Sequence, residues 1–173
     1  MYEIRTVAPE QLDEHAASFV TLLQDAVDSG ASVGFVPPLD DDAARRYWAG
    51  VRAAIGGGNR ILLAAVEEGA VLGSVQLDLA AMPNAGHRAE VMKLMVHRAA
   101  RRRGIGRALM RALEDAARRA GRRLIVLDTR PGDSAEQLYA ALGYARGGVI
   151  PRYALSAAGT LDATVYMYRE LDP

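Results

Sequence analysis

The most informative part of the chain is one continuous stretch, Glu90-Val-Met-Lys-Leu-Met-Val-His-Arg-Ala-Ala-Arg-Arg-Arg-Gly-Ile-Gly-Arg-Ala-Leu109, with the segment that follows it to Gly121. Residues 91–96 are mostly apolar, and this pattern predicts a buried strand. After a basic turn, apolar residues recur at helical spacing, and Gly121 supplies a C-terminal stop. The stretch therefore predicts a strand, a turn and a long helix.

The composition of the turn is unusual for the start of a helix. Four arginines crowd this N-terminus, where the helix dipole favours acidic residues: Arg101, Arg102, Arg103 and Arg107. Gly104 and Gly106 remove side chains from the same turn, so a ligand can approach the backbone N–H groups. Together these features predict a bound phosphate or pyrophosphate. The alternative, a solvated basic helix start, leaves the conflict between charge and dipole unexplained.

The pattern Arg101-x-x-Gly104-x-Gly106 after an apolar strand resembles the acetyl-CoA-binding motif of the GNAT N-acetyltransferase family. In that family the loop amides hold the CoA pyrophosphate, and the preceding splayed strand pairs with the pantetheine amides. The resemblance implies acetyl-CoA as cosubstrate and no metal. It assigns the contacts with acetyl-CoA to Leu94, Met95, Val96, Arg101, Arg102, Arg103, Gly104, Ile105, Gly106 and Arg107.

Length and composition fit one domain covering residues 1–173. Lys plus Arg equals Asp plus Glu at 21 each, so no global field draws the chain to nucleic acid or to a membrane. Because cysteine is absent, disulfides, thiolate metal sites and a cysteine nucleophile are excluded. The sequence has no signal peptide and no run long enough to span a bilayer, which favours a soluble cytoplasmic protein. The sequence leaves open whether the protein forms a homodimer.

The rest of the chain predicts an α/β fold of the GNAT type. We expect a central mixed, mostly antiparallel sheet of about seven strands with one parallel splayed pair, flanked by about four helices. The expected helices cover residues 9–28, 40–56, 105–121 and a short segment before Gly143. The expected strands cover residues 2–7, 61–66, 70–79, 91–96, 124–127, 144–150 and 163–171, with a loop at 151–162.

Two carboxylates are candidate bases for accepting a proton from an amine. Glu90 is expected to share a strand face with Leu94 and Val96, which would partly desolvate it and raise its pKa, unless a bulge shifts the alternation. Asp128 ends a buried parallel strand, at the sheet edge where ligands usually bind. An ion pair between Glu90 and Arg88, and capping of the next turn by Asp128, are the structural alternatives.

Tyr139 is the candidate acid. It lies in Ala135-Glu-Gln-Leu-Tyr-Ala-Ala-Leu-Gly143-Tyr, which resembles the second GNAT signature. In that signature a helical tyrosine protonates or hydrogen-bonds the CoA sulfur. The alternative is that Tyr139 only packs beside Leu138 and Leu142.

Further blocks resemble a toxin-resistance branch of the family, whose acceptor is a β-lactam amino acid: Gly30-Ala-Ser-Val-Gly-Phe35, Arg88-Ala-Glu-Val, Lys93-Leu-Met-Val, Leu127-Asp-Thr and Pro151-x-Tyr153. The resemblance implies direct attack of a primary amine in a ternary complex, with Glu90 and Asp128 as bases and Tyr139 as acid. It favours a small amino-acid-like acceptor, among which toxins and antibiotics are candidates. The nearby cations that could bind a carboxylate are His87, Arg88, Arg130 and Arg152. Whether residues 30–35 and residues 151–162 line the acceptor pocket is left open, and for residues 30–35 the alternative is a loop that only covers the core.

Two other functions compete with acetyl transfer. A dinucleotide-binding oxidoreductase would use Gly104 and Gly106 before a helix, with Asp128 as the ribose-binding acid. Against it, Leu109 occupies the position of the third glycine, and several residues separate Val96 from Gly104, whereas the dinucleotide glycines follow their strand directly. A non-catalytic acetyl-CoA-binding module is the second competitor.

Overall fold

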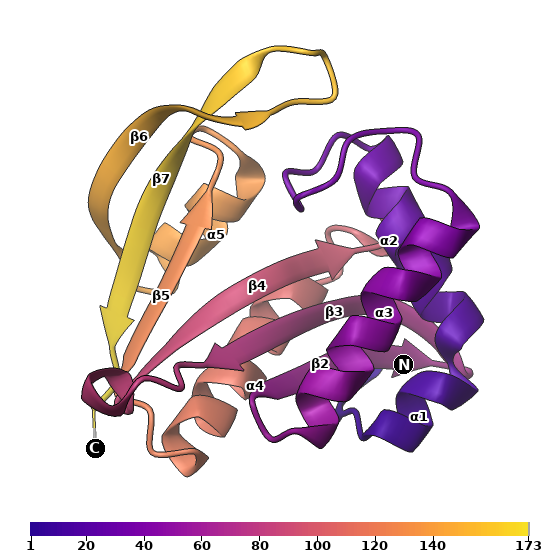
Figure 1. Cartoon of the computed structure of the whole chain (residues 1–173), viewed down its shortest axis with the longest axis horizontal. Helices are drawn as coiled ribbons and strands as arrows, with labels where there is room; N and C mark the ends of the chain where they lie inside the picture. Colours follow the sequence, from indigo (N-terminus) through magenta and orange to yellow (C-terminus); the bar gives the residue numbers. More distant parts are fainter. Residues whose placement is uncertain (173) are drawn as a thin grey trace.

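The computed structural model describes residues 1–172 and contains one seven-stranded sheet with helices on both faces (Figure 1). The sheet is mixed, because one central pair of strands is parallel and the other pairs are antiparallel. Its strands are β1 (Glu3–Thr6), β2 (Arg60–Glu67), β3 (Ala70–Leu79), β4 (Arg88–Val96), β5 (Leu124–Thr129), β6 (Ala145–Leu155) and β7 (Leu161–Glu170).

The strands lie in the order β1-β2-β3-β4-β5-β7-β6, and every neighbouring pair is antiparallel except β4 and β5. The parallel pair is short, running only from Arg88↔Leu124 to Glu90↔Val126. Beyond that point β4 and β5 diverge (Figure 1), and β5 continues beside β7. The predicted GNAT-type sheet with a splayed parallel pair is confirmed.

Five α-helices pack on this sheet: α1 (Pro9–Glu14), α2 (Ala16–Asp28), α3 (Asp41–Gly56), α4 (Ile105–Arg119) and α5 (Ser134–Ala141). Two short 3₁₀ turns, η1 (Pro83–Ala85) and η2 (Arg98–Ala100), flank β4. The single helix expected over residues 9–28 was wrong, because His15 leaves helical geometry with φ −105° and ψ 17°. The break is local, since the Phe19 amide still donates to the His15 carbonyl at 3.1 Å.

The core has two layers, one on each face of the sheet. On one face, α1, α2 and α3 bury a cluster that includes Phe19, Trp48 and Leu62. On the other face, α4 and α5 bury a cluster that includes Leu109 and Leu127. Both layers cover β2, β3 and β4, which explains the near-continuous apolar runs of these strands.

The last two strands form a longer hairpin than the sequence predicts. Residues 151–155 belong to β6 rather than to a loop, and only residues 156–160 connect β6 to β7. A bulge between Ile150 and Ala154 accommodates Pro151 and Arg152, the latter with φ 54°. Because β6 is the edge strand, a proline there sacrifices no hydrogen bond in the sheet interior.

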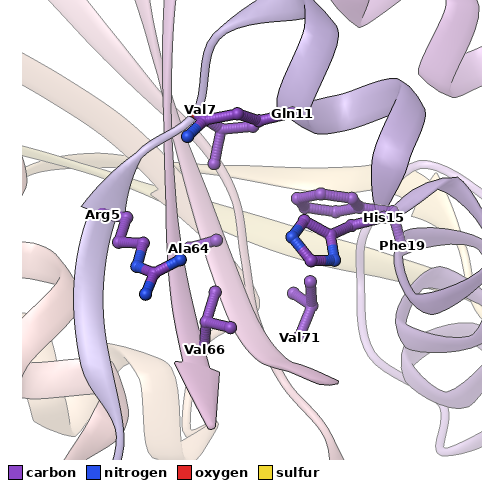
Figure 2. Close-up of a pocket in the computed structure, with 8 residues that line it drawn as sticks. All are labelled: Arg5, Val7, Gln11, His15, Phe19, Ala64, Val66 and Val71. Carbon is purple, nitrogen blue, oxygen red and sulfur yellow. The ribbon is translucent and has the colours of Figure 1, made fainter. Parts of the chain in front are cut away.

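A small hollow lies between β1, β2, β3 and the first two helices, lined by residues such as Val7, His15 and Phe19 (Figure 2). Its volume is about 10 Å³, which is about the space of one water molecule. It therefore offers no room for a substrate. Among residues 1–172 there is also no helix with the length and apolar character needed to cross a membrane.

Candidate active site

The site begins at a bulge in β4. Lys93 has φ 53°, in the left-handed region that residues with a side chain rarely adopt. Between the pairs Gln76↔Met92 and Ser74↔Met95, two residues of β4 face a single residue of β3. This geometry is that of a β-bulge, which bends its strand and redirects the side chains that follow.

The bulge changes which residues share a face of β4. Val91 packs into the core beneath α4, whereas Met95 packs into the opposite layer. Leu94 and Val96 pack against the α4 layer, so Glu90 lies on the other face from both. The expected common face of Glu90, Leu94 and Val96 was therefore wrong, because a strand alternates its side chains only while its register is unbroken.

Where β4 and β5 diverge, the protein has a cleft of about 600 Å³. Its walls come from the loop after α2, β4, the N-terminus of α4, the end of β5 and α5. Most of the predicted site residues line it: Leu94, Met95, Val96, Arg101, Arg102, Gly104, Ile105, Gly106, Arg107, Asp128 and Tyr139. Two segments were candidates for the wall of the acceptor pocket. Residues 30–33 of the first segment line the cleft, whereas residues 151–162 do not.

The glycine turn presents backbone at one end of the cleft. Gly104 is the N-cap of α4 with φ 80°, and it provides no side-chain cap for the first-turn N–H groups. Arg102 also has a left-handed φ, of 64°. At Gly106 helix α4 approaches α5 closely, because a Cβ there would lie 3.3 Å from Leu138 Cδ2. The turn therefore combines an open helix N-terminus with cationic neighbours, which suits an anion.

The four arginines of the turn have different environments. Arg101 donates to the Val96 carbonyl at 3.2 Å and to Ser29 Oγ at 2.7 Å, so it ties the end of β4 to the end of α2. Arg103 does not line the cleft, because it donates to both Glu67 carboxylate oxygens at 2.8 and 2.9 Å. Within residues 1–172, Arg102 and Arg107 make no ion pair, and both line the cleft.

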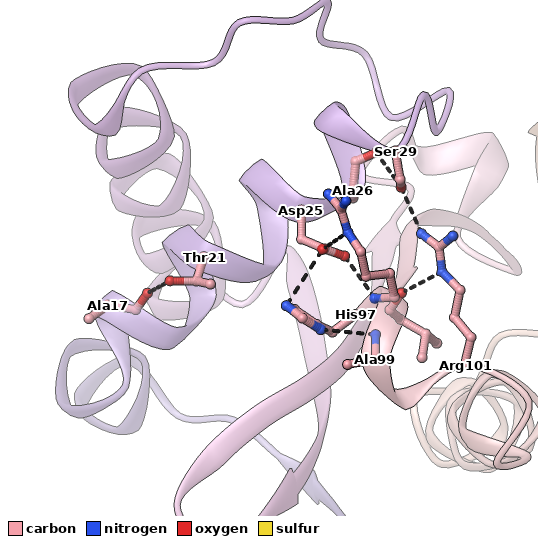
Figure 3. A network of polar contacts seen from close by, with 10 residues as sticks. Ala17, Thr21, Asp25, Ala26, Ser29, His97, Ala99 and Arg101 are labelled. Atoms are coloured by element: carbon pink, nitrogen blue, oxygen red, sulfur yellow. Dashed lines mark hydrogen bonds and ion pairs between the residues drawn. The ribbon is translucent and has the colours of Figure 1, made fainter.

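A polar network fixes this end of β4 against α2 (Figure 3). Asp25 is 8% exposed and accepts hydrogen bonds from the backbone N–H and the guanidinium of Arg98. Burial alone would raise the Asp25 pKa, but these hydrogen bonds and the charge of nearby His97 lower it overall. The carboxylate therefore stays ionised and anchors η2, the segment that leads into the glycine turn.

Glu90 lies at the point where the parallel strands begin to separate. Its side chain is exposed and does not line the cleft, and no ion pair to Arg88 within 4.0 Å forms in the described chain. Burial of its carboxyl raises the Glu90 pKa, and the negative charges of Asp128 and Asp78 raise it further. Glu90 and Asp128 are therefore close enough to share one electrostatic environment.

Asp128 lines the cleft from the end of β5. Its Oδ2 accepts a hydrogen bond of 2.8 Å from the Thr164 hydroxyl on β7, which also donates to the Thr129 carbonyl at 3.0 Å. Among the described residues, the hydrogen bond from Thr164 is the one that orients the Asp128 carboxylate. The alternative role, in which Asp128 caps the following turn, is not observed there. Thr164 was missed by the sequence analysis, because only the pairing of β5 with β7 brings it here.

The position of Tyr139 is compatible with both roles considered from the sequence, packing in the core and contact with a ligand in the cleft. Tyr139 is 5% exposed, belongs to the core that α5 covers and packs against Tyr144, with the rings tilted by 57° and their centroids 5.8 Å apart. It also lines the cleft, and its hydroxyl makes no hydrogen bond within residues 1–172. Burial raises the Tyr139 pKa, and the charge of Asp128 adds to this. The phenol is therefore protonated at neutral pH.

Comparison with known proteins identifies the family and the fold. The model of the acetyltransferase (GNAT) family matches residues 23–144, which contain the glycine turn and Tyr139. The chain belongs to the GNAT family. This GNAT protein is 36% identical over 108 residues, 61% of its length, to a protein of Azospirillum brasilense described as an uncharacterized N-acetyltransferase in the hisH-hisA intergenic region. The match spans 62% of that relative.

Solved structures share the architecture. A GCN5-related N-acetyltransferase from Kribbella flavida superposes with a TM-score of 0.81 and 26% identity, over 98% of both chains. The structure of yncA from Salmonella typhimurium with its cofactor acetyl-CoA superposes with a TM-score of 0.79 and 23% identity, over all of this chain and 95% of that one. The GNAT fold therefore extends over the whole sheet.

The sheet of this GNAT protein excludes the dinucleotide-binding arrangement. That fold needs an open, mostly parallel sheet, whereas here only β4 and β5 are parallel. Within the described residues, no group of three or more His, Asp or Glu side chains could hold a metal ion. The cleft of this GNAT protein therefore brings together an open helix N-terminus with cationic neighbours, the Asp128 carboxylate and the Tyr139 phenol, and Glu90 lies outside its lining.

The expected carboxylate-binding arginines do not face the cleft as free cations. Arg130 is engaged, because its guanidinium lies 3.0 Å from Asp162 and 3.7 Å from Asp133 and donates to the Gly30 carbonyl at 3.2 Å. His87, Arg88 and Arg152 do not line the cleft at all. A further cation that lines the cleft is Lys93, which the sequence analysis did not single out. The sequence did contain a signal that could have drawn attention to this residue, because Lys93 is the only lysine of the chain.

Proposed function

We propose that this protein is an acetyl-CoA-dependent N-acetyltransferase that acts on the primary amine of a small amino-acid-like acceptor. The observation that carries the proposal is the single cleft of about 600 Å³ that joins the glycine turn to Asp128 and Tyr139. A toxin or an antibiotic is within this acceptor class. The proposal treats residues 1–173 as one functional domain, because the sheet uses strands from both ends of the chain.

The residues around the cleft fit acetyl-CoA. A cleft of this volume is in the range that holds a cofactor-sized ligand. The uncapped N-terminus of α4 suits a pyrophosphate, and Arg102 and Arg107 add positive charge beside it. Beyond Glu90 the edge of β4 that faces β5 has no partner strand in the described chain. That free edge can pair with the amides of a pantetheine arm.

Each side chain then has a distinct task in the transfer. Bound acetyl-CoA supplies an activated thioester, whose C–S bond breaks as the new C–N bond forms. Glu90 and Asp128 take the proton that the attacking amine loses, either directly or through a water molecule. Tyr139 holds the proton that the departing sulfur takes up, because its raised pKa keeps it protonated. The products are the N-acetylated acceptor and the free CoA thiol, and solvent returns the proton held by the carboxylates to the Tyr139 phenolate, so protons and bonds balance.

The two cleft-lining arginines provide a test of the cofactor site. Arg102→Gln and Arg107→Gln each remove a cation with no competing ion pair in the described residues. We expect each to weaken acetyl-CoA binding about tenfold, or ~1.4 kcal/mol, measured by isothermal calorimetry. Arg103→Gln is the matched control, because that side chain faces Glu67 instead. Equal losses in all three variants would mean that the turn acts only through its general charge.

The acceptor class is tested by a thiol-release assay over amino acids, dipeptides, β-lactam amino acids, polyamines, aminoglycosides and peptide N-termini. We expect turnover with zwitterionic amino-acid-like compounds. Polyamines should be poor acceptors, because their additional cations would meet the Lys93 ammonium in the cleft. Turnover of polyamines or aminoglycosides with none for zwitterions would refute the acceptor assignment and leave acetyl transfer intact. Failure of acetyl-CoA to bind would refute the activity itself.

A further inference from the structure

Lys93 stands apart in a chain that otherwise uses arginine. The sequence contains 21 Lys and Arg residues, and all except Lys93 are arginine. This one lysine lies in the left-handed position of the β4 bulge and lines the cleft. A left-handed residue other than glycine costs on the order of 1 kcal/mol, and such strain concentrates at functional sites. The bulge therefore aims the only ammonium side chain of the chain into the candidate active site.

The surroundings of the ammonium are unusual for a cation. Lys93 is half-buried, yet within residues 1–172 its Nζ makes no hydrogen bond and no ion pair within 4.0 Å. Its side chain lies against the loop after α2, because a Cβ added at Gly34 would be only 3.1 Å from Nζ. Burial lowers the Lys93 pKa, Asp128 and Glu90 raise it, and Arg60 lowers it. A half-buried ammonium that has no fixed partner is suited to a ligand anion.

We propose that Lys93 Nζ binds the carboxylate of the acceptor and thereby selects zwitterionic amines. This inference rests on the proposed function. The acceptor ammonium would lie near Glu90 and Asp128, which attract it and take its proton, and the acceptor carboxylate would lie against Lys93. The opposite charges of protein and ligand are then matched at both ends. Arg130 cannot serve this purpose, because Asp162, Asp133 and the Gly30 carbonyl already occupy its guanidinium.

The structure favours lysine over arginine at this point. An ammonium is a compact charge, whereas a guanidinium is larger and planar. The ammonium packs on the open face of Gly34, because a Cβ added there would lie only 3.1 Å from Nζ. Gly34 itself has φ 80°, so a side chain there would be strained as well as close to Lys93. Glycine at position 34 therefore leaves space for the Lys93 head group at the side of the cleft.

The kinetic test compares acceptors that differ only in the carboxylate. Each L-amino acid is paired with its carboxamide, which keeps the amine and removes the negative charge. Lys93→Met keeps an unbranched side chain, one atom shorter than lysine, and removes the cation. We expect it to lower kcat/KM for the acids at least tenfold, mainly through KM, and to change kcat/KM for the amides less than threefold. Arg46→Met, which removes an exposed cation of α3 without an ion pair in the described residues, should leave the preference unchanged.

A second measurement does not require turnover. Reductive methylation with ¹³C-formaldehyde labels only Lys93 and the N-terminal amine, because no other lysine is present. The Lys93 resonance is assigned as the one missing from Lys93→Met. We expect amino acids, added in the presence of CoA, to shift this resonance and to raise the pH at which it titrates, whereas the carboxamides should do neither.

These two experiments separate the inference from the activity on which it rests. Equal losses for acids and amides in Lys93→Met would assign Lys93 to positioning of the carboxylates and overturn the proposal. A tenfold loss of acetyl-CoA affinity in the same variant would assign the ammonium to the cofactor and also overturn it. The absence of any Lys93 response to the amino-acid panel would have the same consequence. Acetyl transfer to another amine would still stand in each case.

Discussion

Replacement of Tyr139 by Phe is expected to lower kcat about 100-fold, or ~2.7 kcal/mol, while the KM for acetyl-CoA stays nearly constant. The phenol lines the cleft, makes no hydrogen bond within residues 1–172, and has a raised pKa because it is buried. Its hydroxyl therefore remains available to the sulfur as negative charge develops there. Because this contact strengthens only in the transition state, its loss lowers kcat rather than cofactor affinity.

Tyr144→Phe is the matched control for this measurement. Tyr144 is buried and its ring packs against that of Tyr139 in a tilted arrangement, but it does not line the cleft. Removing its hydroxyl should leave kcat within about twofold of wild type, even if thermal stability changes. If Tyr139→Phe keeps the wild-type kcat, Tyr139 has only a packing role, which is consistent with its place in the core cluster.

The second large effect concerns the two carboxylates. Glu90→Gln is expected to lower kcat/KM by about 100-fold at neutral pH, because it removes a base of raised pKa. Asp128→Asn should cause a loss of the same order. If both groups act on one proton path, the double variant should be little worse than the poorer single variant. Fully multiplicative losses would show that Glu90 and Asp128 act independently.

The pH profile distinguishes the two variants further. The base must be deprotonated to act, so activity falls as pH drops through the Glu90 pKa. The negative charge of Asp128 raises that pKa, so Asp128→Asn should lower it and move the acidic limb of kcat/KM to lower pH. Glu90→Gln should remove that limb. An acidic limb that stays in place in Asp128→Asn would show that the two carboxylates do not interact in the working enzyme.

The sequence by itself determined most of the secondary-structure elements and predicted an anion site at the glycine turn. Apolar periodicity predicted the strand before the turn, the helix after it and the crossover to a parallel β5, because these depend on local pattern. Gly104 and Gly106 with their arginines predicted the helix N-terminus that forms one end of the cleft. Tyr139 was predicted from its signature, and it lines the same cleft.

Only the tertiary structure decided how the side chains face one another. The bulge at Lys93 separated Glu90 from the face of Leu94, and a bulge depends on pairing with β3 rather than on the sequence of β4 alone. The partners of Arg103 and Asp128 come from distant segments, Glu67 and Thr164, which no local pattern connects to them. The same non-local pairing leaves Lys93 unpaired among the described residues, in the cleft where β4 and β5 diverge.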